Sequence, residues 1–325
     1  MTTNIIIWLV VLILTVGAGW LTWRAVRAQR MWVKIAGGIG AGLLTIVLAA
    51  LTFFGGKGIQ MAYFPDAPEP PRLVAEGTPE QIARGDYLVN LNCIGCHSAV
   101  GADGNPTEEH PLNGGWNISQ SEGFGFVGDL VAENLTPGGK LANYTDAEIF
   151  RVMRNRVTKE GHLSVFMSLL PVNEYSDDDV LSIIAYLRTL PPVEQSAVTG
   201  DKLSFLGGIM FGAGMFGTPA EGAPTVTAPP QGVTAEYGKY VATFAECRGC
   251  HGPDATGTPA SAMGPAVPNP RPLVGTLSLE QFDQMMRTGI KPDGNPFPET
   301  MPWQIASRLT EDDLAALYAY LTTEP

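Results

Sequence analysis

The 325 residues are enough for two modest domains with accessory segments, and 38 glycines with 26 prolines predict much irregular backbone between short elements. The formal net charge is −12, and all 32 acidic residues but only 15 of the 20 basic residues lie beyond residue 60. An anionic surface of this kind excludes a nucleic-acid partner, because polyanions are repelled from it.

Two uncharged apolar runs, residues 5–23 and 35–54, occupy the start of the chain. Each reaches the roughly 20 residues that a membrane-spanning helix needs. The turn between them should stay on the cytoplasmic side because it is basic; its charged residues are Arg24, Arg27, Arg30 and Lys34. A cleaved signal peptide is the alternative, but the first run lacks a basic start. We predict a membrane hairpin over residues 1–60 in a bacterial cytoplasmic membrane, then a linker over residues 61–77.

The rest of the chain contains one kind of unit twice. The first, residues 78–192, opens at Thr78 with TPEQIARGDYLVNLNCIGCH, and the second, residues 233–325, opens at Thr234 with TAEYGKYVATFAECRGCH. Threonine is a good helix N-cap, and Gln81 predicts a capping box. In both units the opening helix contains Gly-x-Tyr and runs into a cysteine pair.

Each unit also closes with a helix, capped by Ser176 or by Thr310. Apolar residues at helical spacing predict a buried stripe on each closing helix: Val180, Ile183, Ile184 and Leu187 in the first, and Leu314, Leu317, Tyr318 and Leu321 in the second. Further helices should begin at the capping boxes Thr145–Glu148 and Ser278–Gln281. No convincing run of alternating strand residues appears, so we predict an all-α fold whose two units are joined by an apolar, Gly/Pro-rich linker over residues 193–232.

All four cysteines lie in two CxxCH motifs. These are Cys93, Cys96 and His97, and Cys247, Cys250 and His251. A zinc ribbon would place its second pair about 15–20 residues away, and a thioredoxin-type pair needs a βαβ setting that we do not see. CxxCH is the attachment motif of c-type haem, in which both thiols form thioethers with the vinyl groups and the histidine ligates iron. We therefore predict two covalently attached haem c groups.

A methionine is the usual sixth ligand in such sites, because its thioether favours ferrous iron. Met167 and Met301 each lie 9 residues before the cap of a closing helix. This shared register predicts them as the axial ligands opposite the two motif histidines. Met263, in a loop, is a weaker competitor at the second site. Three other methionines fall within amphipathic helices and are expected in the core: Met153, Met285 and Met286.

Two histidines lie outside the motifs, His110 and His162. Either could replace Met167 and give a bis-histidine haem of low potential. We favour the alternative, an ordinary surface or propionate-contacting histidine.

The two units resemble class I cytochrome c domains over about residues 78–322. FGFVGDLVAENLTPGG, with the helix from Thr145 and YSDDDVLSIIAYLRTLPP, is most similar to the cytochrome c subunits of membrane-bound alcohol and gluconate dehydrogenases. The resemblance implies CxxCH attachment, histidine–methionine ligation, and electron transfer out of a dehydrogenase toward quinone or an oxidase. The chain departs from that family in having two CxxCH motifs rather than three, and in its amino-terminal hairpin.

We expect a membrane-anchored dihaem cytochrome c, not itself an enzyme, that relays electrons on the extracytoplasmic side as a subunit of a respiratory or photosynthetic complex. Its expected partners are other membrane redox subunits, an electron donor and acceptor, and the lipid bilayer. One alternative is the electron-accepting subunit of a dehydrogenase. Another is a dihaem enzyme, such as a peroxidase or a sulfur-compound oxidoreductase, which needs an open ligand position. A haem-based sensor is disfavoured, because we see no cytoplasmic output domain.

Residues 203–216, LSFLGGIMFGAGMF, form an uncharged apolar segment inside the linker. The segment is too short to span a bilayer, and it would be an aggregation hazard if exposed to water. Packing between the units, immersion in the membrane interface and contact with another protein all suit this composition. We predict a partner or membrane contact, in which Phe211 and Phe216 can be changed to serine with monomer stability nearly intact.

Overall fold

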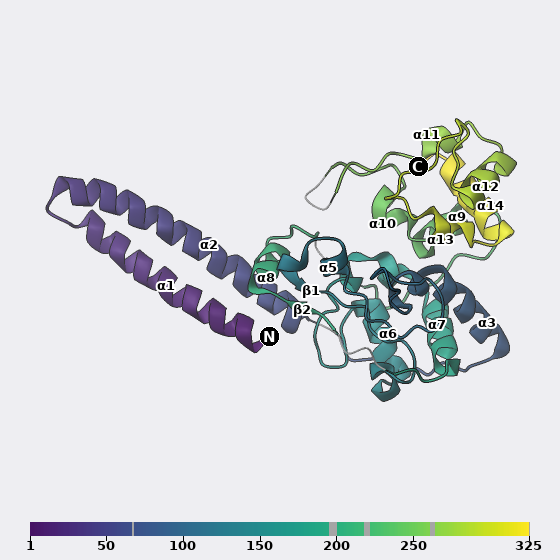
Figure 1. Ribbon diagram of the computed structural model, residues 1–325, viewed down its shortest axis with the longest axis horizontal. Coiled ribbons are helices and arrows are strands. Elements are labelled where there is room, and N and C mark those ends of the chain that lie inside the picture. The colour runs from purple at the N-terminus through teal and green to yellow at the C-terminus, as the bar shows by residue number, and fades with distance from the viewer. Residues whose placement is uncertain (67, 195–199, 218–221, 261–263, 325) are drawn as a thin grey trace.

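A long helical hairpin projects from two lobes of short helices and loops (Figure 1). The computed structural model describes residues 1–66, 68–194, 200–217, 222–260 and 264–324. In the hairpin, α1 spans Thr2–Val26 and α2 spans Gly38–Tyr63, with a π-helical turn over Val33–Gly37 before α2. Both are long and apolar enough to cross a membrane. The second helix continues three residues beyond the hairpin boundary expected at residue 60.

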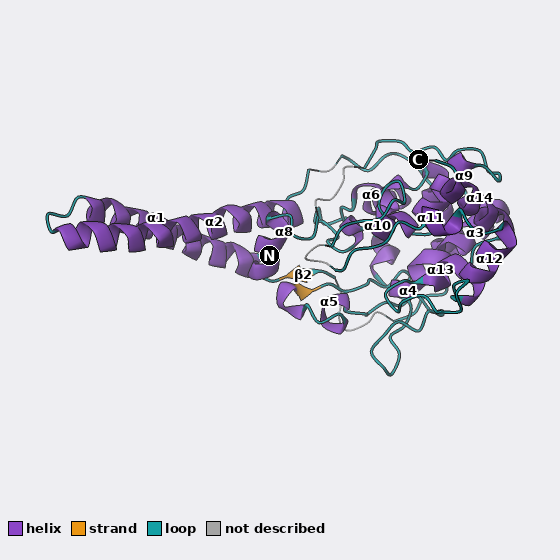
Figure 2. Cartoon of the chain, turned by 90° about the horizontal axis from the view of Figure 1, so that it is seen from above, coloured by secondary structure: helices purple, strands orange, loops and turns teal. Residues whose placement is uncertain are grey.

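Hydrogen bonds between side chains join the two hairpin helices. The hydroxyls of Thr15 and Thr52 are 2.8 Å apart, and those of Thr22 and Thr45 are 2.9 Å apart. The indole N–H of Trp8 donates to the Thr52 carbonyl at 2.8 Å. These contacts align α1 and α2 along most of their length, as Figures 1 and 2 show.

The first lobe is built from five helices joined by long loops with short helical turns (Figure 2). Its helices are α3 (Pro79–Leu88), α4 (Ile94–His97), α5 (Ile118–Ser121), α6 (Asp146–Asn155) and α7 (Asp177–Thr189). A π-helical turn over Val89–Cys93 links α3 to α4, so the cysteine motif continues the opening helix. The 3₁₀ turns are Gly125–Val127, Lys140–Asn143, Met167–Leu169 and Pro171–Glu174.

The second lobe has the same succession of an opening helix, a cysteine motif and a closing helix. Its helices are α9 (Ala235–Phe244), α10 (Cys247–His251), α11 (Arg271–Val274), α12 (Leu279–Thr288), α13 (Trp303–Ser307) and α14 (Glu311–Thr322). The predicted stripe of the first closing helix is at most 5% exposed, and that of the second is buried except at the partly buried Tyr318. The helical periodicity of both closing helices is therefore confirmed.

Most of the predicted helix caps are present. Thr145–Glu148 and Ser278–Gln281 form complete capping boxes. Thr78 accepts from the Gln81 backbone N–H, but the Gln81 amide oxygen accepts from Gly77, at 2.8 Å, instead of from Thr78. The capping box expected at Thr78 is therefore incomplete, because the chain enters this helix through a left-handed Gly77.

The linker between the lobes contains a strand and a helix. Strand β2 (Lys202–Leu203) pairs antiparallel with β1 (Gly128–Asp129), a small departure from an all-helical chain. Helix α8 (Phe205–Gly212) follows, and its Phe211 side chain is 0% exposed. Phe211 packs with residues from the end of α2 and from the first lobe.

The sequence-based expectation for Phe211 is therefore wrong. A serine there would leave a cavity in a packed cluster, with an expected loss of about 3–5 kcal/mol in the free energy of unfolding. Composition could not reveal this, because an apolar segment looks the same whether its partner is its own chain or another molecule.

Two tyrosines exchange positions between the lobes. Tyr240, from the second lobe, donates to the Asp179 carboxylate at 2.6 Å and accepts from the backbone N–H of Ser176, the cap of the first closing helix. Tyr87, from the first lobe, donates to Asp313 at 2.7 Å in the corresponding turn of the second closing helix. These are the tyrosines of the two Gly-x-Tyr motifs, so each opening helix contacts the closing helix of the other lobe. The lobes share one hydrophobic core as a result.

The glycines of the same motifs explain how each opening helix packs on its own closing helix. A Cβ atom on Gly85 would lie 1.9 Å from the Ser182 carbonyl oxygen, and one on Gly238 would lie 1.9 Å from the Ala316 carbonyl oxygen. We expect Gly85→Val and Gly238→Val each to lower the free energy of unfolding by about 3 kcal/mol or more, because overpacking forces the helices apart. Urea unfolding measures this loss, and Gly232→Val, whose Cβ would meet nothing within 4 Å, is the control. Equal stability of all three variants would contradict the expected contact.

Candidate functional site

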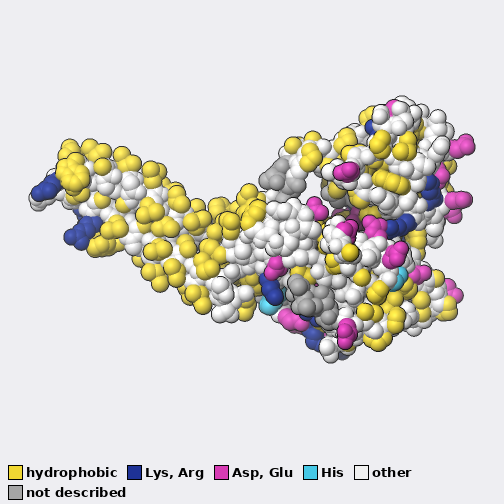
Figure 3. Space-filling view, in the orientation of Figure 1, with side chains coloured by type: hydrophobic (Ala, Val, Ile, Leu, Met, Phe, Trp, Pro, Cys, Tyr) yellow, Lys and Arg dark blue, Asp and Glu magenta, His cyan; other side chains and the backbone are white. Residues whose placement is uncertain are grey.

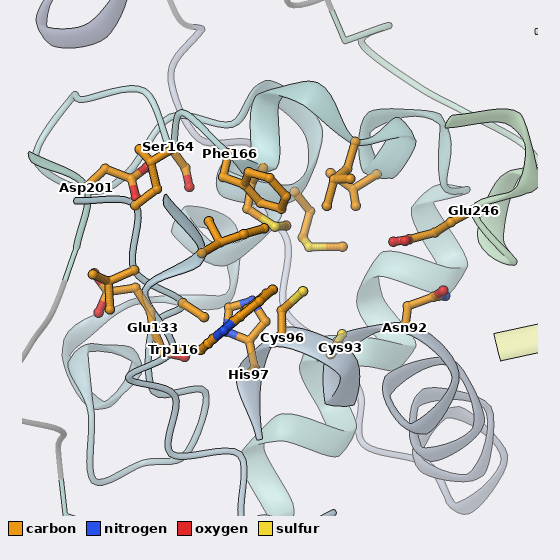
Figure 4. A pocket seen from close by; sticks show the side chains of 18 of the residues that line it. Asn92, Cys93, Cys96, His97, Trp116, Glu133, Ser164, Phe166, Asp201 and Glu246 are labelled. Atoms are coloured by element: carbon orange, nitrogen blue, oxygen red, sulfur yellow. The ribbon is translucent and has the colours of Figure 1, made fainter. Parts of the chain in front are cut away.

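The first lobe encloses a cavity with about 800 Å³ of empty space, part of it open to solvent. Ligand pockets typically measure roughly 300–1,000 Å³. Figure 4 shows the ring of His97 and the thiols of Cys93 and Cys96 on one side of this cavity, with Phe166 on the other. Met167 lines the same cavity. The four residues predicted for the first site therefore meet in one place.

His97 is oriented by a backbone carbonyl. Its Nδ1 lies 2.7 Å from the Glu133 carbonyl oxygen, which can only accept, so Nδ1 carries the hydrogen. Burial lowers the pKa of His97, with the hydrogen bond to Glu133 opposing the shift. The imidazole is therefore neutral, and its Nε2 is the free acceptor nitrogen, which is the state in which histidine binds a metal.

The second motif repeats this arrangement. The Nδ1 of His251 lies 2.9 Å from the Pro268 carbonyl oxygen. Met301 and Cys247 are partly buried against the shared core, whereas Cys250 is exposed. Met263, the competing ligand considered from the sequence, lies outside the described residues. The second motif is thus the more solvent-exposed of the two.

The cysteine sulfurs are thiols rather than thiolates. Burial raises the pKa of Cys93, of Cys96 and of Cys247 to about 12 in each case. A redox-active or zinc-binding cysteine pair would require the thiolate form. Within the described ranges, moreover, no group of three or more His, Cys, Asp or Glu side chains could hold a metal ion. These observations disfavour the zinc and redox-pair interpretations of CxxC.

The structure separates the competing sixth ligands of the first site. His110 is exposed beside Asn90, and His162 packs against Tyr63 at the end of the hairpin. Neither histidine lines the cavity, whereas Met167 does. A second methionine, Met153 of α6, also lines it. Sequence reasoning assigned Met153 to the core, because helical periodicity alone does not reveal that a core position borders a cavity.

Trp116 tests whether the cavity suits a haem group. Among the described residues its buried indole N–H has no hydrogen-bond partner, and the residue lines the cavity. A buried donor is costly to leave unpaired, and a haem carries carboxylate groups that accept hydrogen bonds. The thiol pair, the oriented imidazole, the thioether and this donor together fit haem c. Trp116 is remote from the motifs, and nothing in its sequence surroundings indicated this position.

One lining residue belongs to the other lobe. Glu246 immediately precedes Cys247 of the second motif, yet its side chain reaches the first cavity (Figure 4). Burial raises the pKa of this carboxyl group to about 7. Asn92, next to Cys93, donates in return to the Phe244 carbonyl of the second lobe. The two cysteine motifs are therefore neighbours across the contact between the lobes.

Comparison with known proteins agrees with this chemistry. Residues 235–324 match the sequence model of the family described as Cytochrome c. The second lobe is thus a cytochrome c domain, a fold that binds haem iron and serves electron transport. Two apolar amino-terminal helices, which fit a membrane anchor, precede the lobes.

Three relatives are similar to parts of this chain. The fructose dehydrogenase cytochrome subunit of Gluconobacter japonicus is 30% identical over 150 residues, covering 42% of this chain and 29% of its own length. The cytochrome c subunit of the quinone-dependent alcohol dehydrogenase of Gluconacetobacter polyoxogenes is 30% identical over 123 residues, or 34% and 26%. One of the subunits of nicotinate dehydrogenase from Pseudomonas putida is 33% identical over 138 residues, or 35% and 11%. The chain therefore matches less than a third of the length of each of these relatives.

Proposed function

We propose that this chain is a membrane-anchored dihaem cytochrome c that relays electrons between redox partners outside the cytoplasm. The observation that carries the proposal is the meeting of Cys93, Cys96, His97 and Met167 in one cavity. The repetition of the carbonyl-oriented histidine at His251 supports a second site of the same kind. When bound, haem supplies an iron that alternates between the ferric and ferrous states and so carries one electron.

The protein residues would hold and tune this group. In the first site Cys93 and Cys96 attach it, His97 and Met167 are its axial ligands, and the buried Trp116 N–H offers a hydrogen bond. In the second site, Cys247 and Cys250 attach the group, and His251 with Met301 ligate it. Two strong axial ligands leave little reason for small molecules to bind, which suits electron transfer better than a peroxidase-type reaction.

The proposed arrangement places both cytochrome c domains on one side of the membrane. Residues 1–60 would form the hairpin, residues 61–77 a linker, residues 78–192 the first domain and residues 233–325 the second, joined by residues 193–232. The basic turn of the hairpin supports a cytoplasmic location for the turn. Both ends of the hairpin, and so both lobes, would then lie on the extracytoplasmic side of a bacterial cytoplasmic membrane.

The relatives favour one kind of partner. Each is named as part of a dehydrogenase, acting on fructose, an alcohol or nicotinate. We propose that this chain likewise accepts electrons from a dehydrogenase subunit and passes them to a membrane acceptor, as part of a larger electron-transport complex.

Purification of the tagged full chain in mild detergent tests this function. We expect a dehydrogenase polypeptide to copurify, and its substrate to reduce both haems, as recorded by the visible absorption bands of ferrous haem c. A chain that purifies alone and whose ferrous form readily binds carbon monoxide would contradict the relay proposal, because an open ligand position favours a dihaem enzyme.

A further inference from the structure

Helix α8 lies against the outer end of α2 with their backbones in direct contact. A Cβ atom on Gly58 would lie 1.8 Å from the Gly208 carbonyl oxygen, and one on Gly212 would lie 2.1 Å from the Phe54 carbonyl oxygen. Phe205 packs on Gly55 in the same way. The depth of α8 in the molecule is therefore the depth of residues 54–58 of the hairpin.

The charges of the second hairpin helix locate that depth relative to a bilayer. Lys34 and Lys57 are its only charged residues, and the 22 residues between them are uncharged. At about 1.5 Å per residue, the two lysines are about 35 Å apart along the helix, which matches a hydrocarbon core of about 30 Å. The indole of Trp8, a side chain that favours membrane interfaces, lies beside Gly56. Residues 54–58, and with them α8, thus stand at the outer boundary of the hydrocarbon.

One face of α8 is packed and the other is not. Phe211 is 0% exposed, and Gly207 lies against the backbone of Val127 in the first lobe. Leu206 on α8 is 50% exposed, and Phe126, in the turn that α8 contacts, is 55% exposed. No charged residue occurs over residues 203–216. This apolar surface adjoins the apolar side chains that cover the hairpin in Figure 3, where acidic groups appear only on the lobes.

We propose that α8 and the Phe126 turn are immersed in the lipid at the boundary between headgroups and acyl chains, so that the first lobe is seated on the bilayer. The occupant of this surface is lipid, because the surface is continuous with the hairpin and lies at its outer end. The inference rests on the proposed membrane anchoring of the hairpin. Ile118, Leu130 and Phe166 line the first cavity and also pack in the cluster that contains Phe211. The first cavity is therefore the membrane-proximal one.

Spin labels on the full-length, haem-loaded chain in phosphatidylcholine vesicles test this inference. Leu206→Cys and Phe126→Cys probe the proposed lipid contact. Ile46→Cys probes the middle of α2, where Ile46 is 66% exposed, and Leu279→Cys, 42% exposed on the second lobe, is the aqueous control. In the reduced protein, power saturation compares the accessibility of each label to oxygen, which partitions into lipid, with that to a water-soluble nickel chelate. An unchanged haem spectrum shows that each variant has folded.

We expect the oxygen-to-nickel accessibility ratio to be highest at position 46, several-fold lower at positions 206 and 126, and lowest at position 279. If positions 206 and 126 match position 279, the lipid contact is wrong, even though position 46 lies in the membrane. If positions 206 and 126 are shielded from both reagents, protein covers the surface, and the proposal also fails. A low ratio at position 46 would instead overturn the membrane anchoring on which the inference rests.

Discussion

Changing Met167 or Met301 to alanine should each remove about half of the near-infrared sulfur–iron charge-transfer absorption of the ferric protein. Each change should also lower the potential of one haem, because the thioether stabilises ferrous iron. Axial ligands tune haem potentials over roughly 0.8 V, so we expect a drop of about 0.1–0.3 V for one of the two haems. Near-infrared absorption and a spectroelectrochemical titration measure both effects.

Met153 supplies the matched control, because it lines the same cavity as Met167. Met153→Ala should leave the charge-transfer band at full intensity and cost only packing energy. If Met153→Ala removes the band and Met167→Ala does not, then Met153 is the ligand in the first site. Retention of the full band in both variants would indicate that a histidine occupies the sixth position.

Changing Cys96 or Cys250 to alanine should leave one haem that acid–acetone extraction removes and one that it does not. The intact protein should exceed the mass of its polypeptide by two haem groups, and each variant should retain one full attachment, because every site relies on its own thiol pair. Intact-mass spectrometry before and after extraction gives the count. The first site should lose more stability than the second when its haem is lost, since its cavity lies inside the lobe while α10 has no buried residue.

Serine at Cys96 or Cys250 is the corresponding size-matched control and should give the same count as alanine. Bound zinc or free thiols in the unmodified protein would overturn the haem assignment at both motifs. Loss of both haems from one single variant would show that the two sites do not form independently.

The sequence by itself determined the features that depend on near neighbours in the chain. Two cysteines and a histidine within five residues share one helical turn wherever that helix packs, so CxxCH indicated its chemistry directly. The capping boxes at Thr145 and Ser278 and the buried stripes of the closing helices formed as predicted, because hydrogen bonds and periodicity over three or four residues govern them. The apolar hairpin helices belong to the same class, since length and hydrophobicity suffice to predict them.

Only the tertiary structure decided which distant residues complete the site. Trp116, Met153 and Glu246 line one cavity although up to 153 residues separate them from Cys93. The tyrosine of each Gly-x-Tyr motif reaches the other lobe's closing helix, and α8 packs on the hairpin through glycine backbones. Such contacts are favourable only when two whole surfaces match in shape and polarity. The spacing of residues along the chain carries no record of that match, so the cavity and the seat of the first lobe emerge only from the folded molecule.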